Sequence, residues 1–298
     1  MKKISVLIIF LIFIITGCTT NKQNNNFKIT VTSFPCYDIT KAIVKENAEV
    51  DMLIKPGTEV HSYEPTPQDI INISKSDIFI YIGGASDEWV DNVLESVDNK
   101  DLKVIKLIDY VDVLDDSDHD HHHDVDEHIW TNPLNMIKMT NIIKETVVEI
   151  DSKNSNMYEE NATKYINEIN VLHEEFKNVI SNAKRKTIVF ADRFPFKYFA
   201  LEYGIDYKAA YNSCSSESEV SAKTLSELID YVNDNNIPAV FYLELSNQNI
   251  ANTIQNETDC DKKLFHSGQN VTSEEFKNGI TLLEIMENNL ENLKGALN

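Results

Sequence analysis

The sequence has 298 residues, of which 42% are hydrophobic and 25% are charged. This length is enough for two lobes that each bury a core of their own. Its 48 acidic residues outnumber the 27 basic ones and give a formal net charge of −21. Because such a surface repels a phosphate backbone and concentrates cations, we expect no nucleic-acid partner.

The N-terminus has the pattern of an export signal with a lipid anchor. Two lysines precede an apolar run over residues 4–15, which is too short to cross a bilayer as a helix and is typical of a signal peptide. The residues ending at Cys18 resemble a bacterial lipobox. We expect a signal peptide over 1–17, a lipid anchor with a flexible tether over 18–27, and an extracytoplasmic, membrane-anchored protein. An ordinary signal peptide with an incidental cysteine is the alternative.

Residues 28–135 alternate between short strands and helices. Apolar and β-branched runs predict strands at 29–32, 50–54, 78–82 and 102–107, and apolar residues at helical spacing predict helices at 37–44, 69–76 and 86–97. The run at 78–82 does not alternate, as is typical of a strand buried on both faces in a parallel sheet. This half is predicted to be a β/α lobe.

His61 lies in the loop after the second of these strands. Thr66 as N-cap, Pro67 in the first helical position and Asp69 near the positive end of the dipole predict a helix that starts just behind this loop. A loop that enters a helix can present a side chain to a cleft. A lone loop histidine is more often solvated, so His61 counts as a ligand only beside a second metal-binding stretch.

Such a stretch ends the first lobe. Its histidines are His119, His121, His122, His123 and His128, and seven carboxylates lie between residues 115 and 127. Imidazole nitrogens and carboxylate oxygens suit a borderline divalent metal. The low-complexity part, 116–124, indicates an accessory metal-collecting loop or a solvated tract. His128, in contrast, stands beside apolar residues, as a fixed ligand would.

A long helical region follows and leads into a second β/α lobe. Apolar residues at steps of three and four predict one helix over 155–183, roughly 40 Å long. We interpret it as a spine within a connecting region, 136–186. Residues 187–298 then repeat the pattern of the first half, with predicted strands at 187–190, 207–210, 239–244 and 263–265, and helices at 196–203, 221–232, 249–255 and 276–293.

Three polar residues of the second half follow predicted strand ends, where α/β folds place ligands: Asp192, Glu244 and His266. They are candidates for the far wall of an interlobe cleft. Beyond Cys18 the chain has Cys36, Cys214 and Cys260, an odd number. Cys214 and Cys260 could form a disulfide, or all three are thiols.

Two motifs together resemble those of a known family. The stretch PGTEVHSYEPTPQD, which contains His61, and DEHIWTNP, which contains His128, resemble the ligand motifs of the ZnuA-like solute-binding lipoproteins of zinc and manganese ABC importers, also called cluster A-I. The resemblance covers essentially the whole mature chain. It implies an α/β fold of two β/α lobes joined by one long helix. It also implies a metal in the interlobe cleft, with two ligands from each lobe.

The resemblance implies His61 and His128 as the ligand pair of the first lobe, but the second lobe departs from the family pattern. Arg193 stands where the family usually has a histidine, and a guanidinium has no lone pair to give. His266 stands where the family usually has a carboxylate and is itself a suitable ligand. Asp192 is the weaker choice for the fourth ligand.

Water and Glu244 are rivals of Asp192 for that fourth position. Three imidazoles and one oxygen favour Zn²⁺ over Mn²⁺. Arg193 would then stand behind the ligands and pair with Glu217 or Glu219.

The function implied by the resemblance is capture of Zn²⁺ and delivery to a membrane permease with its ATPase, by a monomer that catalyses no reaction. A metallohydrolase is disfavoured because no H-E-x-x-H motif occurs. Two alternatives stay open. One is a metal-dependent surface adhesion or scaffolding protein. The other is an importer component whose cargo is a chelated metal or an anion, and Arg193 in the site would indicate that cargo.

Overall fold

The N-terminal half contains one parallel four-stranded sheet covered by helices. The computed structural model describes residues 27–114, 125–211 and 220–298. The strands are β1 (Lys28–Val31), β2 (Glu49–Met52), β3 (Ile78–Tyr81) and β4 (Lys103–Lys106), and the helices are α2 (Phe34–Val44), α3 (Pro67–Ser74) and α4 (Trp89–Ser96). Their order across the sheet is β2, β1, β3, β4, with every pair parallel. All four residues of β3 are buried, as its unalternating apolar run predicts.

The C-terminal half repeats this topology. Its strands are β5 (Thr187–Phe190), β6 (Asp206–Ala209), β7 (Ala239–Tyr242) and β8 (Asp261–Leu264), and its helices are α7 (Lys197–Tyr203), α8 (Ala222–Asp234), α9 (Asn249–Glu257), α10 (Ser273–Asn278) and α11 (Leu282–Leu297). The strand order is β6, β5, β7, β8, again all parallel. The two halves are therefore built on the same sheet topology.

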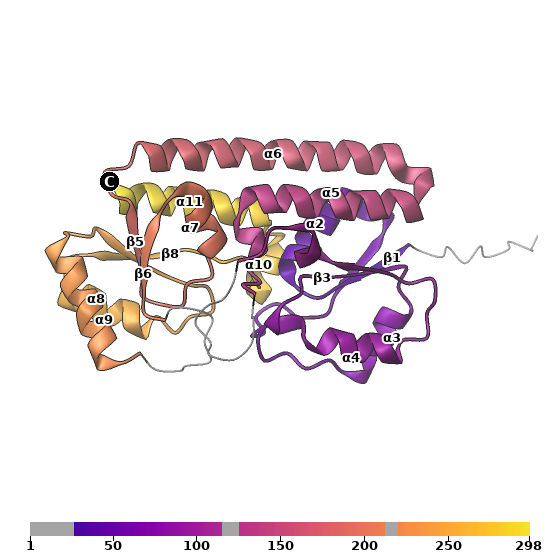
Figure 1. Ribbon diagram of the computed structural model, residues 1–298, viewed down its shortest axis with the longest axis horizontal. Helices are drawn as coiled ribbons and strands as arrows, with labels where there is room; N and C mark the ends of the chain where they lie inside the picture. The colour runs from indigo at the N-terminus through magenta and orange to yellow at the C-terminus, as the bar shows by residue number, and fades with distance from the viewer. Residues whose placement is uncertain (1–26, 115–124, 212–219) are drawn as a thin grey trace, which may run out of the picture.

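A long helix spans both halves. After α5 (Pro133–Ile150), helix α6 (Ser155–Ser181) continues for 27 residues, roughly 40 Å at 1.5 Å per residue. Figure 1 shows α6 running along one side of the whole molecule, with α5 beneath it over one lobe and α11 beneath it over the other. The predicted fold, two β/α lobes joined by one long helix, is confirmed.

The spine helix is part of the core of both lobes. Its buried residues follow helical spacing: Tyr158, Ala162, Tyr165, Ile169, Leu172, His173, Phe176 and Ile180. One continuous cluster of buried side chains contains this stripe together with residues of both sheets and of α11. Burial of each large apolar side chain stabilises the fold by about 1.5–3 kcal/mol. The helix thus joins the halves through packing as well as through the chain.

Asp38 ties three helices together beneath the spine. It lies in α2, its carboxylate accepts a hydrogen bond from the hydroxyl of Tyr165 in α6 (3.1 Å), and it also accepts one from the backbone N–H of Leu282 in α11 (3.1 Å). Burial raises the pKa of Asp38 to about 6, although both hydrogen bonds act in the opposite direction. A buried acidic group therefore links the two halves.

The C-terminal helix differs from the prediction. Instead of one helix over 276–293, α10 ends at Gly279, which has a left-handed φ of 76°, and α11 begins after a new N-cap at Thr281. Thr281 and Glu284 exchange hydrogen bonds in a capping box. The apolar stripe continues across this break, so periodicity alone did not reveal it.

Two of the cysteines are described, and both are buried thiols. They are Cys36 and Cys260, while Cys214, the proposed disulfide partner of Cys260, lies outside the described residues, as does Cys18. Among the described helices, none combines the length and the apolar character that a membrane crossing requires.

Candidate metal centre

His61 lies in the loop between β2 and α3. The helix behind it starts where the sequence predicts. Thr66 Oγ1 accepts a hydrogen bond from the backbone N–H of Asp69 (3.3 Å), and the Asp69 carboxylate accepts one from the backbone N–H of Thr66 (2.7 Å). This capping box fixes the end of the loop that follows His61.

The other end of the loop is bound to the C-terminal half. Asn270 donates from Nδ2 to the carbonyl oxygens of Lys55 (2.9 Å) and Thr58 (2.8 Å). The backbone N–H of Gly57 donates to the carbonyl oxygen of Val271 (2.7 Å). Although His61 belongs to the first lobe, its loop is held in place by the second.

His128 lies just before α5 and is almost fully buried, with 4% of its surface exposed. Its Nδ1 atom lies 2.9 Å from Oδ1 of Asp126. Since a carboxylate can only accept, Nδ1 carries the proton and Nε2 carries the lone pair, which is the arrangement typical of a metal-binding histidine. Burial alone would raise the pKa of Asp126, but the charge and hydrogen bonds of His128 outweigh it and hold that pKa below its usual value. The indole of Trp130 donates to the carbonyl oxygen of Ser267 (2.8 Å) and ties this segment to the second lobe.

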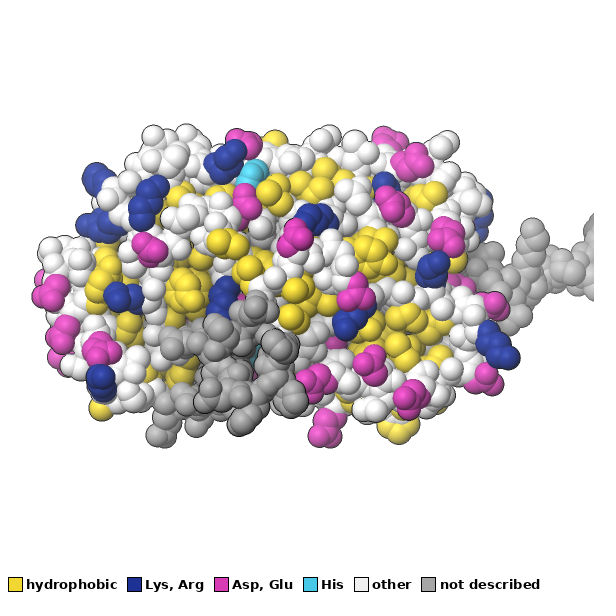
Figure 2. Space-filling model, viewed as in Figure 1, with side chains coloured by type: hydrophobic (Ala, Val, Ile, Leu, Met, Phe, Trp, Pro, Cys, Tyr) yellow, Lys and Arg dark blue, Asp and Glu magenta, His cyan; other side chains and the backbone are white. Residues whose placement is uncertain are grey.

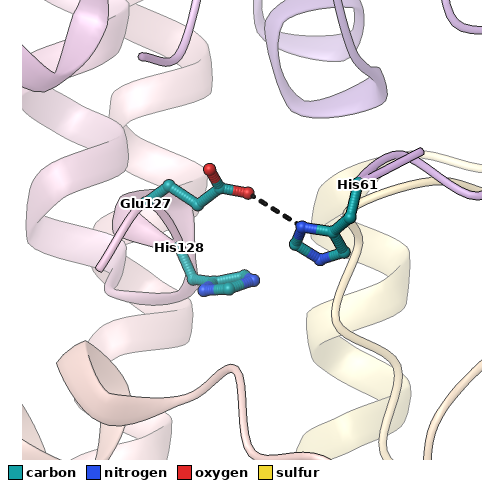
Figure 3. A group of neighbouring side chains, drawn as sticks. All are labelled: His61, Glu127 and His128. Carbon is teal, nitrogen blue, oxygen red and sulfur yellow. Dashed lines mark ion pairs between the residues drawn. The ribbon is translucent and has the colours of Figure 1, made fainter. Parts of the chain in front are cut away.

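Glu127 joins the two histidines. One ligand atom from each of His61, Glu127 and His128 lies within 4.8 Å of the others, and no other such group of three potential ligands occurs among the described residues. Figure 3 shows the Glu127 carboxylate turned toward the His61 ring, with the His128 ring below them. The distance from Glu127 Oε1 to His61 Nδ1 is 3.6 Å, and the two imidazole centroids are 6.2 Å apart.

Ser86 connects Glu127 to His61 and determines the tautomer of that histidine. Its hydroxyl contacts both Glu127 Oε1 and, at 2.8 Å, His61 Nδ1. The carboxylate is the stronger acceptor, so the hydroxyl donates to it and accepts from the Nδ1 proton of His61. The Nε2 lone pair of His61 is then directed at the cleft, where Gln269 Nε2 of the second lobe lies 3.3 Å away. In both histidines the lone pair of the neutral ring is thus on Nε2.

His266 is buried on the opposite side and belongs to a different network. Its backbone N–H donates to Asn289 Oδ1 (2.7 Å), and its Nδ1 accepts from the backbone N–H of Gly268 (2.9 Å). Nε2 lies 3.9 Å from Glu275. Burial would lower the pKa of His266, but the nearby carboxylates of Glu244 and Glu275 outweigh it and raise that pKa. In this structure His266 is not part of the group formed by the other two histidines.

The two carboxylates predicted near the cleft are held by backbone donors. Asp192 accepts from the N–H groups of Arg193 (2.9 Å) and Leu243 (3.3 Å). Glu244 accepts from the N–H of Ser267 (2.8 Å) and from its hydroxyl. These contacts give both carboxylates fixed positions at the ends of β5 and β7.

Two adjoining cavities lie between the lobes. One, of about 60 Å³, is lined by His61, Glu59, Arg193 and Glu244 among others. A second, of about 230 Å³, shares the last three of these residues and adds Asp192. Arg193 lies 3.9 Å from Glu59 across the cleft. A larger groove of about 830 Å³ runs along α6 but contains none of the candidate ligands.

Several predicted residues lie outside the described residues. These are the accessory histidines His119, His121, His122 and His123, the predicted Arg193 partners Glu217 and Glu219, and the predicted lipidation site Cys18. Their roles stay predictions.

Comparison with known proteins identifies the family. The family model ZnuA, described as zinc-uptake complex component A periplasmic, matches residues 29–296. This chain belongs to the ZnuA family. It is 32% identical over 306 residues to the zinc-binding lipoprotein AdcA of Streptococcus pneumoniae, covering 99% of this chain but 61% of that protein. It therefore spans about three fifths of the length of that relative.

The high-affinity zinc uptake system protein ZnuA of Bacillus subtilis is 27% identical over 292 residues, covering 95% of this chain and 91% of that protein.

Solved structures of ZnuA-like proteins have the same fold. The Zn(II)-bound ZnuA-like domain of pneumococcal AdcA superposes with a TM-score of 0.78 at 31% identity, covering 91% of this chain and 99% of that one. The metal-dependent lipoprotein YcdH of Bacillus subtilis gives a TM-score of 0.81 at 27% identity, covering 91% and 100%. The predicted family is confirmed.

Three residues that lie beside the candidate ligands were not predicted there: Ser86, Glu127 and Gln269. Glu127 was counted only among the carboxylates of the histidine-rich stretch, although its place beside His128 was a usable signal. Gln269 had no signal in the sequence, because its position against His61 depends on how the two lobes pack.

Proposed function

We propose that this chain is the zinc-binding, solute-binding component of a metal ABC importer. The observation that carries the proposal is the meeting of His61 and His128 at the lobe boundary, each with Nδ1 beside a neighbour that accepts its proton, so that the lone pair of each neutral ring is on Nε2. Imidazole nitrogen is a preferred donor for Zn²⁺. The names of the pneumococcal and Bacillus relatives, both tied to zinc, support the same cargo.

His266 and Asp192 are our proposed donors from the second lobe. His266 Nε2 is buried and makes no hydrogen bond within the described part of the chain. Because Nδ1 accepts from the backbone N–H of Gly268, Nε2 carries the proton of the neutral ring, so metal binding through Nε2 requires that proton to move to Nδ1 and this hydrogen bond to break. To reach the first-lobe histidines it would exchange its contact with Glu275 for the metal. Two or three imidazoles with one or two oxygens favour Zn²⁺ over Mn²⁺, which prefers more oxygen ligands.

The proposal includes export, anchoring and delivery. Cys18 carries the lipid that holds the protein outside the cytoplasmic membrane, and the histidines of 116–124 collect metal. A monomer passes the ion to a permease driven by its ATPase and catalyses no reaction. Because ligands come from both lobes, a permease that tilts the lobes apart weakens the coordination and releases the ion.

Arg193 does not favour an anion as the cargo. The two cavities that it lines are also lined by three carboxylates, those of Glu59, Asp192 and Glu244. A free anion there would meet more negative than positive charge. A divalent cation is the ligand that this charge distribution attracts.

Zinc titration of the purified protein in competition with a chromophoric chelator tests the proposal. We expect about one tightly bound Zn²⁺, lost in a His61→Ala, His128→Ala double variant, and weaker ions lost when residues 119–123 are deleted. Tight binding that survives in the double variant would refute the site.

Substitutions in the second lobe test its donors in the same assay. His266→Ala should weaken zinc binding far more than Arg193→Ala, because only the imidazole has a lone pair to give. The reverse order would contradict the proposed second-lobe ligands.

A further inference from the structure

We propose that Glu127 is a direct ligand of the metal, so that the first lobe supplies three ligands and the second lobe supplies one. This inference rests on the proposed function and puts Glu127 in the place of Asp192, the weaker of the two proposed second-lobe donors, so that His266 is the ligand from the second lobe. Arg193 has no lone pair with which to bind a metal. Glu127 provides the missing protein ligand from the opposite wall.

The position of Glu127 is built into the fold. Only 5% of its surface is exposed, and its Oε2 accepts from the backbone N–H of Ser86 (2.7 Å). Gly84 lies directly against it with φ of 91°, and a Cβ atom at that position would come within 2.6 Å of the Glu127 Cβ. Trp89 holds the same turn by donating from Nε1 to the carbonyl oxygen of Ser86 (3.1 Å). The carboxylate is therefore fixed before any ion binds.

The charge of Glu127 requires a cation. Among the described residues, the one basic side chain with a nitrogen within 4 Å of its carboxylate is His61, at 3.6 Å. His61 is neutral when Ser86 holds its Nδ1 proton and its Nε2 binds metal. A buried carboxylate with no positive partner is costly, and a dication beside it removes that cost. The donors from Ser86 and the amide of Gln269 are neutral groups, so their hydrogen bonds leave the negative charge uncompensated.

The spacing of the group is close to that of a coordination shell. The three potential ligand atoms lie within 4.8 Å of one another without an ion. Zinc bonds of about 2.0–2.2 Å in tetrahedral geometry place ligand atoms about 3.3 Å apart, so a contraction of about 1–2 Å completes the site. Side-chain rotation within a loop and a buried segment can supply that movement.

The second lobe closes over this group through Gln269. Its Nε2 lies 3.3 Å from His61 Nε2 and 3.5 Å from Glu127 Oε1, so the amide occupies the open side of the three ligands. When an ion binds, the amide has to move aside for the fourth ligand. The ion would then enter and leave on the side of the second lobe.

Substitution of Glu127 by glutamine tests the inference. Glu127→Gln keeps an oxygen for the Ser86 N–H and removes the charge, and we expect its zinc affinity to fall by at least about 100-fold. Glu145→Gln is the matched control, because it removes the charge of an exposed carboxylate of α5 that lines neither cleft cavity, and its affinity should change less than about threefold. Thermal unfolding of the metal-free variants shows whether each one folds.

X-ray absorption of the zinc-loaded wild type and of the Glu127→Gln variant separates a ligand from an orienting neighbour. A direct ligand predicts the loss of one oxygen scatterer at about 2.0–2.2 Å, whereas an unchanged shell would overturn the inference. Wild-type affinity in Glu127→Gln would overturn it as well. A wild-type protein that binds no zinc tightly would instead refute the proposed function, and this inference with it.

Discussion

At the scale of single residues, the two histidines are oriented before the metal arrives. Asp126 accepts the Nδ1 proton of His128 over 2.9 Å, and the Ser86 hydroxyl lies 2.8 Å from Nδ1 of His61. A ligand that is already held in position loses little rotational freedom when the ion binds. A carboxylate partner also makes the imidazole a better donor. These neighbours are expected to raise affinity without touching the ion.

Asp126→Asn removes the charge from that arrangement and keeps an oxygen that can accept from His128. We expect its zinc affinity to fall by about 10–100-fold, as is usual for the partner of a metal-binding histidine. Chelator competition measures the change. Asp112→Asn, at a fully exposed carboxylate, is the control and should bind like the wild type. Equal affinities for the two variants would show that Asp126 is not such a partner.

The sequence was sufficient to single out the two histidines that the structure brings together, but not their surroundings. His61 and His128 each stand in a motif whose local pattern can be read directly. Ser86 and Gln269 come from distant parts of the chain, and their contacts with His61 depend on the packed structure. For His266 and Asp192 the sequence indicates the right strand ends, but not the hydrogen bonds that now hold them.

At the scale of elements, the important contact lies between the His61 loop and the segment that precedes α10. Asn270 is 3% exposed and donates to the carbonyl oxygens of Lys55 and Thr58. A loop carrying a ligand is otherwise free to move on its own. Because of this contact, separation of the lobes and displacement of His61 are expected to occur together.

Asn270→Ala should therefore weaken zinc binding by about three- to tenfold and speed zinc release. The variant loses two hydrogen bonds, each worth about 0.5–1.5 kcal/mol, and 1.4 kcal/mol corresponds to a factor of ten in affinity. Stopped-flow release into excess chelator measures the rate.

Asn99→Ala provides a matched control for this prediction. Asn99 also donates to two carbonyl oxygens, those of Ser74 and Ser76, at 3.0 Å each, but within the first lobe. We expect lower stability and unchanged zinc release. If Asn99→Ala and Asn270→Ala release zinc at the same rate, the link between the lobes does not control His61.

Predicted elements agreed with the structure where one local signal dominates. The spine helix was predicted over 155–183 and occupies Ser155–Ser181, because its apolar stripe is long and unbroken. The last helix was predicted as one element but forms two, α10 and α11. Gly279 and the N-cap Thr281 interrupt the helix, although the apolar residues keep their helical spacing across the break. Capping residues inside a stripe were the available signal.

At the scale of the whole molecule, the negative net charge attracts every kind of cation and does not distinguish one metal from another. Figure 2 shows acidic side chains scattered over the visible face among Lys and Arg, without one dominant patch. The formal charge of −21 raises the concentration of any cation near the surface. We therefore expect discrimination between metals to depend on the proposed imidazole and carboxylate ligands of the cleft.

Stability of the metal-free protein should depend on pH through Asp38. The pKa of Asp38 in the folded protein, about 6, lies above the ordinary aspartate value of 3.8, so the folded protein binds the proton more tightly than the unfolded chain. The resulting stability is fully present below pH 3.8 and is lost as the pH rises through about 6. Glu284 and Lys45 are the nearby charges, and their effects on this pKa are opposite.

Asp38→Asn should lack this dependence. Relative to the variant, the wild type should gain about 1–3 kcal/mol in free energy of unfolding as the pH falls from 7 to 4. Urea unfolding at several pH values measures the difference, and Glu46→Gln, at an exposed carboxylate, is the control. Parallel profiles for wild type and Asp38→Asn would contradict the assignment of Asp38 as the titrating group.

The repeated pattern of strands and helices was enough to predict two similar lobes. It contained no information on how they meet. The shared core beneath α6, the Asp38 contacts and the bonds of Asn270 all join residues far apart in the chain. The cleft is a product of these long-range contacts, so its exact donor set could not be read from local pattern.

A crystal structure of the zinc-loaded protein, with anomalous scattering recorded on both sides of the zinc edge, tests the central claim most directly. We expect one strong peak in the cleft, about 2.0–2.2 Å from Nε2 of His61, Nε2 of His128 and one oxygen of Glu127. A peak that lacks both histidines, or no peak in the cleft, would contradict the account.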